Sequence, residues 1–381
     1  MNNRAGHTVK NLTGDAAYES FYPSPLPPVP PVSLDEEGLR LLREANRRLA
    51  LLDGLAARIP DMGLFVAMYV RKEALVSSQI EGTQCTLDDI LSPAIEKNVN
   101  ADVSDVVNYV NAVTFATERM KTLPLCNRLI REAHEVLMQG VRGEEKTPGE
   151  FRTSQNWIGG VGSTLKNARY IPPNPADMED CLSSLEQFMN AEDTLDPLVR
   201  AALIHYQFET IHPFLDGNGR VGRLLITLYL MASGQLSSPV LYLSCYLKSN
   251  KIEYYDRMSE VRRRGDYEQW VNFFLRGIAE SAGDATETID RLSALRGKNE
   301  EKLSAFPSLK ATSARALLRY LESHPMIETR ATAEALGASY NTVARLIGDF
   351  CKAGILAKTE KHGKAQIYSY EEYLEILRKD T

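Results

Sequence analysis

A stretch of twelve residues, His212 to Arg223, gathers side chains of the types that handle phosphate groups. It reads HPFLDGNGRVGR and leads directly into the apolar pattern of a helix. Glycines at a helix start let backbone N–H groups turn toward an anion, which the positive end of the helix dipole also attracts. Arg220 and Arg223, three residues apart on one helical face, would add two guanidinium groups, which suit several phosphates. The stretch therefore predicts a phosphate-binding site at a helix N-terminus.

Two other side chains in this stretch could act on a bound phosphate compound. The imidazole of His212 can accept the proton of an attacking hydroxyl near neutral pH. The carboxylate of Asp216, at the rim of the loop, is suited to a Mg²⁺ ion that also binds phosphate oxygens and water. Each residue taken alone has a structural interpretation, as a hydrogen-bonded histidine, a turn aspartate or an arginine in an ion pair. Their concentration in one short loop favours a catalytic site.

Gly217, Gly219 and Gly222 also satisfy the GxGxxG pattern of dinucleotide-binding proteins. The surroundings argue against that interpretation, because Pro213 disfavours a central strand and no alternation of strands and helices flanks the segment. The stretch also lacks the Lys-Ser/Thr ending of a Walker A loop. We therefore do not expect a Rossmann or P-loop site.

Helical segments must hold this loop in place. Ser33 to Glu36 resembles a capping box that begins a helix. Apolar residues recur at helical spacing in segments 64–80, 103–120, 125–138, 178–189, 197–206, 221–232 and 254–263. The sequence predicts a mainly α-helical protein to about residue 300.

Two segments interrupt the helical pattern. Residues 152–173 carry a glycine-rich turn between the strand-like runs 156–158 and 168–171, which predicts a β-hairpin that stands out of the helical body. Residues 23–31 are rich in proline and favour an extended arm. We expect this arm to lie against its own domain, and binding to an SH3-like partner stays open as the alternative.

The last 75 or so residues have a different pattern. Helical segments 312–322, 331–336 and 341–352 are followed by two β-prone runs, 355–359 and 365–368. Helix, helix, helix and hairpin is the order of a winged helix. The C-terminal region is therefore predicted to be a winged-helix-like domain.

Composition excludes several classes of protein. The chain has 381 residues, 44% hydrophobic and 25% charged, with a formal net charge of −6, so we expect a globular protein whose charge does not draw it generally to nucleic acid. The five cysteines are scattered and form no CxxC pair, which argues against a disulfide framework or a thiolate metal site. With no long apolar run and no secretory signal pattern at the N-terminus, we expect a cytoplasmic protein without a membrane span.

The loop motif is specific enough to indicate a family. HPFLDGNGRVGR matches the Fic motif HxFx(D/E)GNGRxxR at every defined position, and the preceding HYQFETIH is similar as well. The chain thus resembles the Fic family over approximately residues 60–280. The resemblance implies a helical Fic core and a protein adenylyltransferase, which moves AMP from ATP to a Ser, Thr or Tyr hydroxyl of a target protein and releases pyrophosphate. Relatives often dimerise, so a homodimer is expected.

The resemblance also assigns roles to individual residues. His212 would be the general base, Asp216 the Mg²⁺ ligand and Tyr255 a residue that holds the nucleoside, although a core aromatic is the alternative for Tyr255. Residues 152–173 would be the flap on which the target docks, with Ile158 and Tyr170 as contacts. The implied ATP-binding residues of the loop are Gly217, Asn218, Gly219, Arg220, Val221, Gly222 and Arg223, the last reaching the γ-phosphate.

A second motif concerns regulation. Ser77 to Gly82, SSQIEG, matches the family's inhibitory signature (S/T)xxxE(G/N). Gly82 is a natural residue to follow a helix C-terminus, which places Glu81 at the negative end of the dipole, where an offsetting cation is expected. The resemblance implies that this cation is Arg223, so that a Glu81–Arg223 pair keeps ATP from binding productively. Glu81 could instead position water for removal of AMP, and this alternative stays open.

We expect three regions: an N-terminal region at 1–115 with the proline-rich arm and the inhibitory helix, a Fic catalytic domain at 116–295, and a winged-helix-like domain at 305–381. The last region supports a competing function, a nucleotide-sensing regulator that binds DNA. Four lysines and one glutamate lie at the end of its third helix and in its hairpin, so this surface could contact DNA phosphates. They are Lys352, Lys358, Lys361, Lys364 and Glu360. Docking to protein stays open as the alternative.

Overall fold

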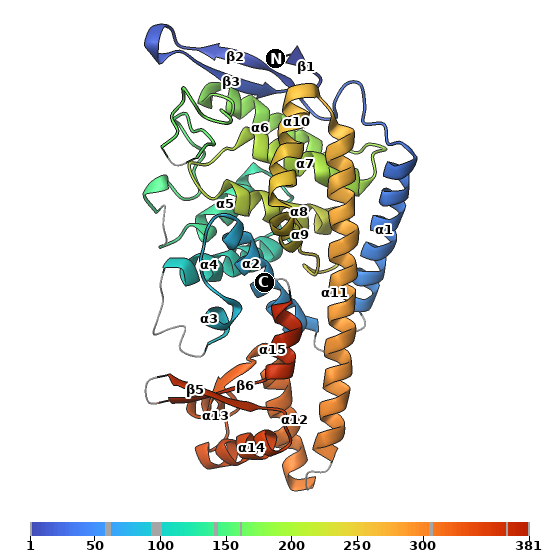
Figure 1. Cartoon of the computed structure of the whole chain (residues 1–381), viewed down its shortest axis with the longest axis vertical. Helices are drawn as coiled ribbons and strands as arrows, with labels where there is room; N and C mark the ends of the chain where they lie inside the picture. The colour runs from blue at the N-terminus through green and yellow to red at the C-terminus, as the bar shows by residue number, and fades with distance from the viewer. Residues whose placement is uncertain are drawn as a thin grey trace.

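The computed structural model describes residues 2–57, 62–92, 101–140, 144–160, 162–304, 308–362 and 365–379. Most of them are helical, and the molecule is elongated (Figure 1). The first helices are α1 (Glu36–Ala56), α2 (Met62–Ile80), α3 (Leu87–Leu91), α4 (Ala101–Arg119), α5 (Asn127–Leu137), α6 (Pro175–Asn190), α7 (Pro197–Ile211) and α8 (Asn218–Ala232). The later helices are α9 (Ser244–Ser249), α10 (Lys251–Arg264), α11 (Tyr267–Ser304), α12 (Ser308–Ser323), α13 (Thr329–Ala335), α14 (Tyr340–Lys352) and α15 (Glu371–Arg378). The strands are β1 (Asn2–Asn3), β2 (Gly6–Asn11), β3 (Tyr18–Pro23), β4 (Met326–Glu328), β5 (Ala357–His362) and β6 (Ala365–Ser369).

The mainly helical architecture agrees with the periodicity of the sequence, but α11 is longer than expected. It runs for 38 residues along one side of the molecule and continues through the charged residues 296–304, which separate the domains expected at 116–295 and 305–381 (Figure 1). Its last turns bind the C-terminal region, since Arg296 pairs with Glu322 and the Asn299 amide donates to the Tyr370 hydroxyl at 2.6 Å. These charges belong to a helix and not to a linker.

The N-terminus forms an antiparallel sheet that the sequence did not predict. Strands β1, β2 and β3 pair in that order, with Gly6 opposite Pro23 and His7 opposite Tyr22. The N–H of Phe21 donates to the Ile171 carbonyl at 3.0 Å, so the sheet lies against the base of the 152–173 segment. Short polar strands of this kind have a weak alternation signal.

The start of α1 corrects the expected capping box. The N-cap is Asp35, whose Oδ1 accepts the Gly38 N–H at 2.8 Å. Ser33 lies outside the helix, and its N–H donates to Glu268 at 3.0 Å. Aspartate satisfies the free N–H groups of a first turn as well as serine does, so residue type alone cannot decide between two candidates that lie two positions apart.

The proline-rich arm lies against its own domain. The Ser24 carbonyl accepts a hydrogen bond from the Gln207 amide at 2.9 Å. Leu26, Val32 and Leu34 are partly buried and pack on the hydrophobic core. The arm thus joins the N-terminal sheet to α1 across the surface of the core.

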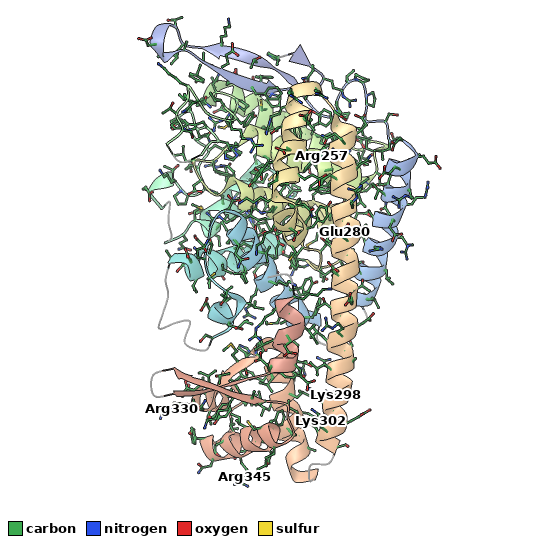
Figure 2. All side chains as sticks on the ribbon, in the orientation of Figure 1. Arg257, Glu280, Lys298, Lys302, Arg330 and Arg345 are labelled. Carbon is green, nitrogen blue, oxygen red and sulfur yellow. The ribbon has the colours of Figure 1, made fainter. Side chains whose placement is uncertain are left out.

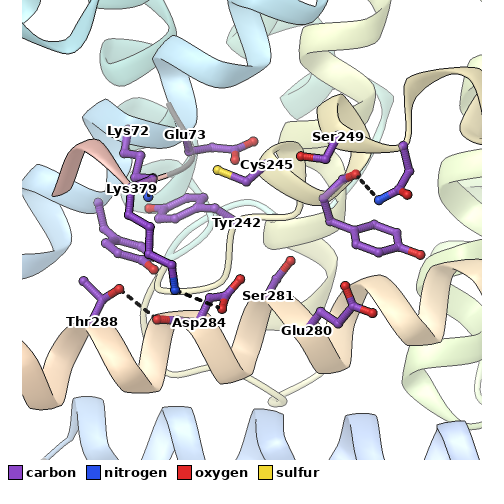
Figure 3. Close-up of a pocket in the computed structure, with 13 residues that line it drawn as sticks. Lys72, Glu73, Tyr242, Cys245, Ser249, Glu280, Ser281, Asp284, Thr288 and Lys379 are labelled. Atoms are coloured by element: carbon purple, nitrogen blue, oxygen red, sulfur yellow. Dashed lines mark hydrogen bonds and ion pairs between the residues drawn. The ribbon is translucent and has the colours of Figure 1, made fainter. Parts of the chain in front are cut away.

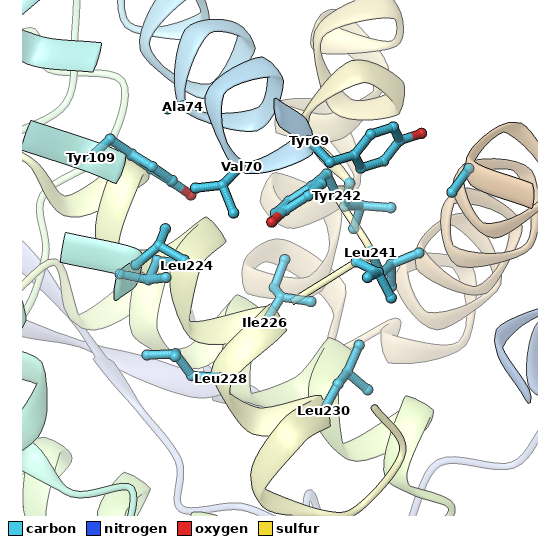
Figure 4. Packing of buried hydrophobic residues seen from close by; sticks show 14 of the residues in the cluster. Tyr69, Val70, Ala74, Tyr109, Leu224, Ile226, Leu228, Leu230, Leu241 and Tyr242 are labelled. Carbon is cyan, nitrogen blue, oxygen red and sulfur yellow. The ribbon is translucent and has the colours of Figure 1, made fainter. Parts of the chain in front are cut away.

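Helix α2 passes through the centre of the molecule. Its residues Val70 and Ala74 are buried, as are Leu224 and Ile226 of α8, and Figure 4 shows these side chains in the packed region between the helices. Tyr109 of α4 lies at the same junction. The C-terminal end of α2 is therefore held next to the N-terminal end of α8 by the core.

The C-terminal region follows the predicted order of elements with two additions, the short strand β4 after the first helix and helix α15 after the hairpin. Its three strands pair in the order β4–β6–β5, and α14 begins one residue before the expected start, capped by Ser339. Of the lysines considered for DNA contact, Lys364 lies outside the described residues. The assignment as a winged helix stays a prediction.

The C-terminal region contacts both α2 and α3. Arg378 donates to the two carboxylate oxygens of Asp88 at 2.9 and 3.1 Å, and Arg71 donates to the Ser323 carbonyl at 3.4 Å. The Lys72 ammonium donates to the Lys379 carbonyl beside a cavity of about 160 Å³ between α2, α9 and α11 (Figure 3). No helix among the described residues is long and apolar enough to cross a bilayer.

Candidate functional site

A cavity of about 550 Å³ brings together residues from five separate segments of the chain. It lies between the end of α2, the 152–173 segment, the loop after α7, the start of α8, and α10. Among the residues predicted for the site, its walls include Glu81, Ile158, Tyr170, His212, Gly219, Arg223 and Tyr255. Its size is within the range of cavities that hold nucleotide-sized ligands.

His212 is placed at this cavity by an uncommon backbone conformation. It caps α7 with φ 50° and ψ 61°, the left-handed region that a residue with a side chain adopts at a cost of roughly 1–2 kcal/mol. Its carbonyl accepts hydrogen bonds from Arg152 Nε at 2.9 Å and Asn156 Nδ2 at 3.2 Å. Burial, followed by the nearby Arg152 charge, lowers the pKa of His212 to about 4. The ring is therefore neutral at pH 7 and able to accept a proton.

The loop between α7 and α8 is closed by its own side chains. Gly217 is the N-cap of α8 with φ 77°, which favours glycine. The Asn218 side chain is buried, accepts the Phe214 N–H at 2.8 Å and donates to the Phe214 carbonyl at 2.8 Å. A phosphate would therefore contact the backbone of Asn218 and not its side-chain amide, which is already bonded to Phe214.

His134 supports the same loop from α5, and sequence reasoning missed it. Its Nδ1 accepts the Gly149 N–H at 2.9 Å, so Nε2 carries the proton and donates to the Asp216 carbonyl at 3.0 Å. The ring stacks on Phe214 with centroids 3.7 Å apart. Burial lowers the pKa of His134 to about 4, which keeps this tautomer neutral. A single histidine in a helical pattern gives no signal of such a role.

Arg223 is bound to the end of α2. Its Nη2 donates to Glu81 Oε1 at 2.7 Å and to the Ser77 carbonyl at 2.9 Å, and its Nε donates to Ser77 Oγ at 2.8 Å. Arg223 is buried, whereas the Glu81 side chain is 40% exposed in the cavity. Although burial acts in the opposite direction on each group, the pairing lowers the pKa of Glu81 and raises that of Arg223. Both groups are charged near neutral pH.

The end of α2 is fixed by a Schellman motif. The Gly82 N–H donates to the Gln79 carbonyl at 3.1 Å, and the Thr83 N–H donates to the Ser78 carbonyl at 3.2 Å. Gly82 has φ 107°, a conformation that residues with side chains rarely adopt. The predicted helix end is therefore present, with Glu81 directly after Ile80, the last residue of α2.

The Glu81 carboxylate lies close to the start of α8. A Cβ added to Gly219 would lie 2.2 Å from Glu81 Oε1, so the absence of a side chain at Gly219 permits the contact. The Lys251 ammonium donates to the Ile80 carbonyl at 2.6 Å and supplies a second cation at this helix end.

Arg220 faces a different direction from Arg223. Its guanidinium is buried, pairs with Asp105 of α4 at 3.2 Å and does not line the cavity. Residues three apart on a helix are separated by about 60° around its axis, which is enough for long side chains to diverge. Val221 and Gly222 also lie within α8 away from the cavity walls.

Asp216 could hold Mg²⁺ as a single carboxylate. Its side chain is 49% exposed, Oδ1 accepts the Gly217 N–H at 2.6 Å, and it does not line the cavity. No group of three metal-binding side chains occurs among the residues that the structure describes. One carboxylate fits an ion that takes its other ligands from phosphate and water, as Mg²⁺ commonly does.

The 152–173 segment pairs at one point only among its described residues. Ile158 and Tyr170 exchange N–H···O bonds of 2.8 and 3.1 Å, and the expected longer strands are absent there. Several glycines weaken strand pairing in this segment. The Tyr170 hydroxyl donates to the Thr210 carbonyl at 2.6 Å, and the Arg262 guanidinium lies 4.0 Å from the centre of its ring. Tyr170 therefore anchors the segment to the core.

Aromatic rings form the cavity wall on α10. Tyr255 is half-buried, and its ring centroid lies 4.9 Å from that of Tyr254. Tyr254 donates its hydroxyl proton to His205 Nε2 at 2.9 Å, because His205 Nδ1 donates to the Gly222 carbonyl at 2.9 Å. This network fixes the aromatic wall relative to α8.

Glu209 lines the cavity, and sequence reasoning missed it as well. It is buried, and its Oε1 has no hydrogen-bond partner among the residues that the structure describes. Burial raises the pKa of Glu209 to about 7. A Cβ added to Gly222 would lie 2.2 Å from Oε1, so Gly222 makes room for this carboxyl group.

Known proteins resemble the chain in sequence. Residues 39–118 match the Fic/DOC family N-terminal model, and residues 124–230 match the Fic/DOC family model. Protein adenylyltransferase Fic of Culex quinquefasciatus is 33% identical over 180 residues, which are 47% of this chain and 32% of that protein. The Drosophila erecta protein of the same name is 29% identical over 226 residues, 57% of this chain and 41% of that protein. The chain thus spans less than half the length of these relatives.

Solved structures resemble it in fold. A Fic family protein from Desulfovibrio desulfuricans G20 superposes with a TM-score of 0.58 at 20% identity, covering 89% of this chain and 97% of its own. A Fic domain containing signaling protein from Bacteroides thetaiotaomicron VPI-5482 gives a TM-score of 0.51 at 19% identity, covering 66% and 97%. The predicted helical Fic fold is confirmed.

Proposed function

The chain belongs to the Fic/DOC family through residues 39–118 and 124–230, and on this premise we propose that it is a protein adenylyltransferase. Its substrates would be ATP and a target protein with a free Ser, Thr or Tyr hydroxyl. The observation that carries the proposal is that His212 and Arg223 line one cavity of nucleotide size. The curated relatives named protein adenylyltransferase Fic support the type of reaction.

The transfer step follows from the positions of these groups. The target hydroxyl oxygen attacks the α-phosphorus of ATP, its proton passes to the neutral imidazole of His212, and the bond to the β-phosphate breaks so that pyrophosphate leaves. The backbone at the start of α8 and the dipole of that helix stabilise the negative charge on the phosphates. Asp216 would hold Mg²⁺, which would neutralise further phosphate charge when bound. Tyr255 would pack against the nucleoside.

The Glu81–Arg223 pair accounts for inhibition in this proposal. The γ-phosphate needs a cation, and all three donor contacts of Arg223 described above are directed to Ser77 and Glu81. A carboxylate in the same cavity also repels the triphosphate. ATP would then bind without its α-phosphorus in line with the target hydroxyl, and release of Glu81 would restore the productive position.

The test is mass spectrometry of candidate target proteins incubated with ATP and the Glu81→Gly variant. We expect a mass increase of one AMP on a hydroxyl side chain, and none with Glu81→Gly/His212→Ala. Transfer of phosphate in place of AMP would overturn the choice of transferred group. A target that carries AMP and loses it when wild type is added would favour the reverse reaction, in which Glu81 positions the water.

A second candidate function rests on the C-terminal region. The face of α14 that carries Tyr340, Asn341 and Arg345 is exposed, and Arg330 of α13 is exposed as well (Figure 2). An exposed helix with basic residues suits contact with a DNA backbone and groove. The full chain, applied to a duplex-DNA column, would elute with rising salt if this function holds. Arg345→Glu should then elute earlier, and failure of the wild type to bind the column would favour docking to protein.

A further inference from the structure

We propose that Arg152 is a positioning residue that joins the 152–173 segment to the catalytic histidine. One guanidinium group binds both ends of this segment and the backbone of His212. The proposal rests on the proposed function, because it gives this segment the task of presenting a target and His212 the task of accepting its proton.

The contacts of Arg152 use all three of its side-chain nitrogens. Nε donates to the His212 carbonyl at 2.9 Å. Nη2 donates to the Pro173 carbonyl at 2.6 Å and to the Ile211 carbonyl at 3.4 Å, and Nη1 donates to the Ser154 carbonyl at 3.3 Å. The Arg152 backbone N–H also donates to the Pro213 carbonyl at 2.9 Å. The planar donor group therefore fixes Ser154 and Pro173 relative to the end of α7.

Burying the Arg152 guanidinium costs free energy, because the charged group leaves water. Arg152 is 2% exposed, and no carboxylate pairs with it among the described residues. Burial lowers its pKa to about 10, which shows how strongly the site disfavours the charge. A charged group without a counter-ion is retained in the core only where several hydrogen bonds satisfy it. Four neutral carbonyl partners around one guanidinium indicate that the site is built for geometry.

Arg152 holds the backbone of His212, the proposed general base, in its observed conformation. His212 has left-handed backbone angles, and its carbonyl is bound by Arg152 and Asn156. Without these bonds the backbone would relax toward the more favourable right-handed region and carry the ring with it. A displacement of about 1 Å at a reacting group reduces the rate by up to about a hundredfold. The Arg152 guanidinium also binds both ends of the 152–173 segment. Docking of a target and the position of the His212 ring therefore depend on one side chain.

Arg152 also acts on His212 through its charge. The charged or titratable groups that face the His212 ring are Arg152, Glu81, Glu209 and Arg262. Removing the positive charge at position 152 makes it easier to protonate the ring, so its pKa should rise. Arg152→Lys keeps the positive charge but cannot donate to four carbonyls from one plane. Arg152→Met removes both the charge and these hydrogen bonds. The two variants separate position from charge.

The experiment measures both effects in the full chain with Glu81→Gly as the background. The steady-state rate and the KM for ATP come from labelling with α-labelled ATP, and the pKa of the His212 ring comes from NMR of protein with ¹⁵N-labelled histidine, assigned with His212→Ala. Arg200→Lys is the matched control. Arg200 is also buried, donates to the Tyr229 hydroxyl at 2.8 Å and does not line the cavity.

For Arg152→Lys we expect kcat to fall at least about tenfold with less than about a twofold change in the KM for ATP. The His212 resonance should shift position in Arg152→Lys and titrate at higher pH in Arg152→Met. Equal kcat losses in Arg152→Lys and Arg200→Lys, or an unchanged His212 resonance, would overturn the proposal. If the background variant transfers no AMP, the adenylyltransferase assignment fails, but the NMR measurement still decides whether Arg152 positions His212. If Arg152→Met does not fold, the Arg152→Lys resonance decides alone.

Discussion

Arg223 Nη2 lies 2.7 Å from Glu81 Oε1, and this contact joins α8 to a residue 142 positions earlier in the chain, directly after the end of α2. Ser77 adds two more hydrogen bonds to the same guanidinium. The helix end is itself fixed by its Schellman motif and by Lys251. The arginine is therefore occupied by a preformed set of acceptors, and a phosphate must displace them to bind it.

Replacing Glu81 by glycine should raise labelling of the protein itself and of its targets. The change removes a hydrogen bond to a charged group, about 1.5–3 kcal/mol, so we expect an increase of at least about tenfold. The measurement is incorporation of label from α-labelled ATP. His212→Ala in the same background should abolish it, and equal labelling by wild type and Glu81→Gly would refute the inhibitory role.

Ser77→Ala should release Arg223 partly. It removes the bond from Nε to Ser77 Oγ, worth about 1 kcal/mol, so labelling should rise about fivefold. Ser78→Ala is the matched control, because Ser78 is equally buried on α2 and its Oγ has no partner in the structure. We expect Ser78→Ala to label like wild type. A similar rise in both variants would mean that loosening of α2 is the cause.

Glu209 should make stability depend on pH. Its pKa is about 7 in the folded protein and near 4.5 in the unfolded chain, so the folded state binds the proton more tightly. Stability should fall as pH rises from about 4.5 to 7, by up to about 3 kcal/mol from this group, and should change no further above that range. Thermal unfolding of wild type and Glu209→Gln at pH 5.5 and 8 measures the difference.

The Glu209→Gln variant should melt a few degrees higher than wild type at pH 8 and lose part of the pH dependence. Glu179→Gln, an exposed position on α6, controls for the loss of one carboxylate. The same pH dependence in wild type and Glu209→Gln would show that the carboxyl group finds a partner in solution.

Transfer of AMP should require a divalent cation. EDTA should abolish labelling by Glu81→Gly, and excess Mg²⁺ should restore it. Asp216→Ala should raise the Mg²⁺ concentration needed for half-maximal labelling by about tenfold or more, because the ion loses its proposed protein ligand. Asp177→Ala, on α6, is a control for charge. An Mg²⁺ requirement unchanged in Asp216→Ala would exclude the assignment of this carboxylate.

Local patterns in the sequence predicted those parts of the site that lie within one element. The helix starting at the glycine loop, the helix end at Gly82 and the helical core follow from capping residues and periodicity. The pairing of Glu81 with Arg223 came from resemblance to the Fic family, since no local pattern relates residues so far apart. The divergence of Arg220 from Arg223 was missed because spacing gives the helical face but not the partner, here Asp105.

Other features depend on burial or on backbone partners, which leave no pattern. Arg152 and His134 bind backbone carbonyl and N–H groups, which nearly all residues possess whatever their side chain. The pKa of Glu209 depends on how deeply α7 is buried. The polar strands of the N-terminal sheet and the charged end of α11 are stabilised by distant segments, so their local composition favoured loops.

The contacts of Arg378 with Asp88 and of Arg71 with Ser323 bear on how this protein should be shortened for study. Deleting the chain after α11 would remove the contacts that the C-terminal region makes with α2 and α3. These two helices precede and follow Glu81 in the sequence. Under the proposed inhibition, a truncated chain would hold Glu81 less firmly against Arg223 and would label its targets faster than the whole chain does. Comparative assays are best made on full-length protein.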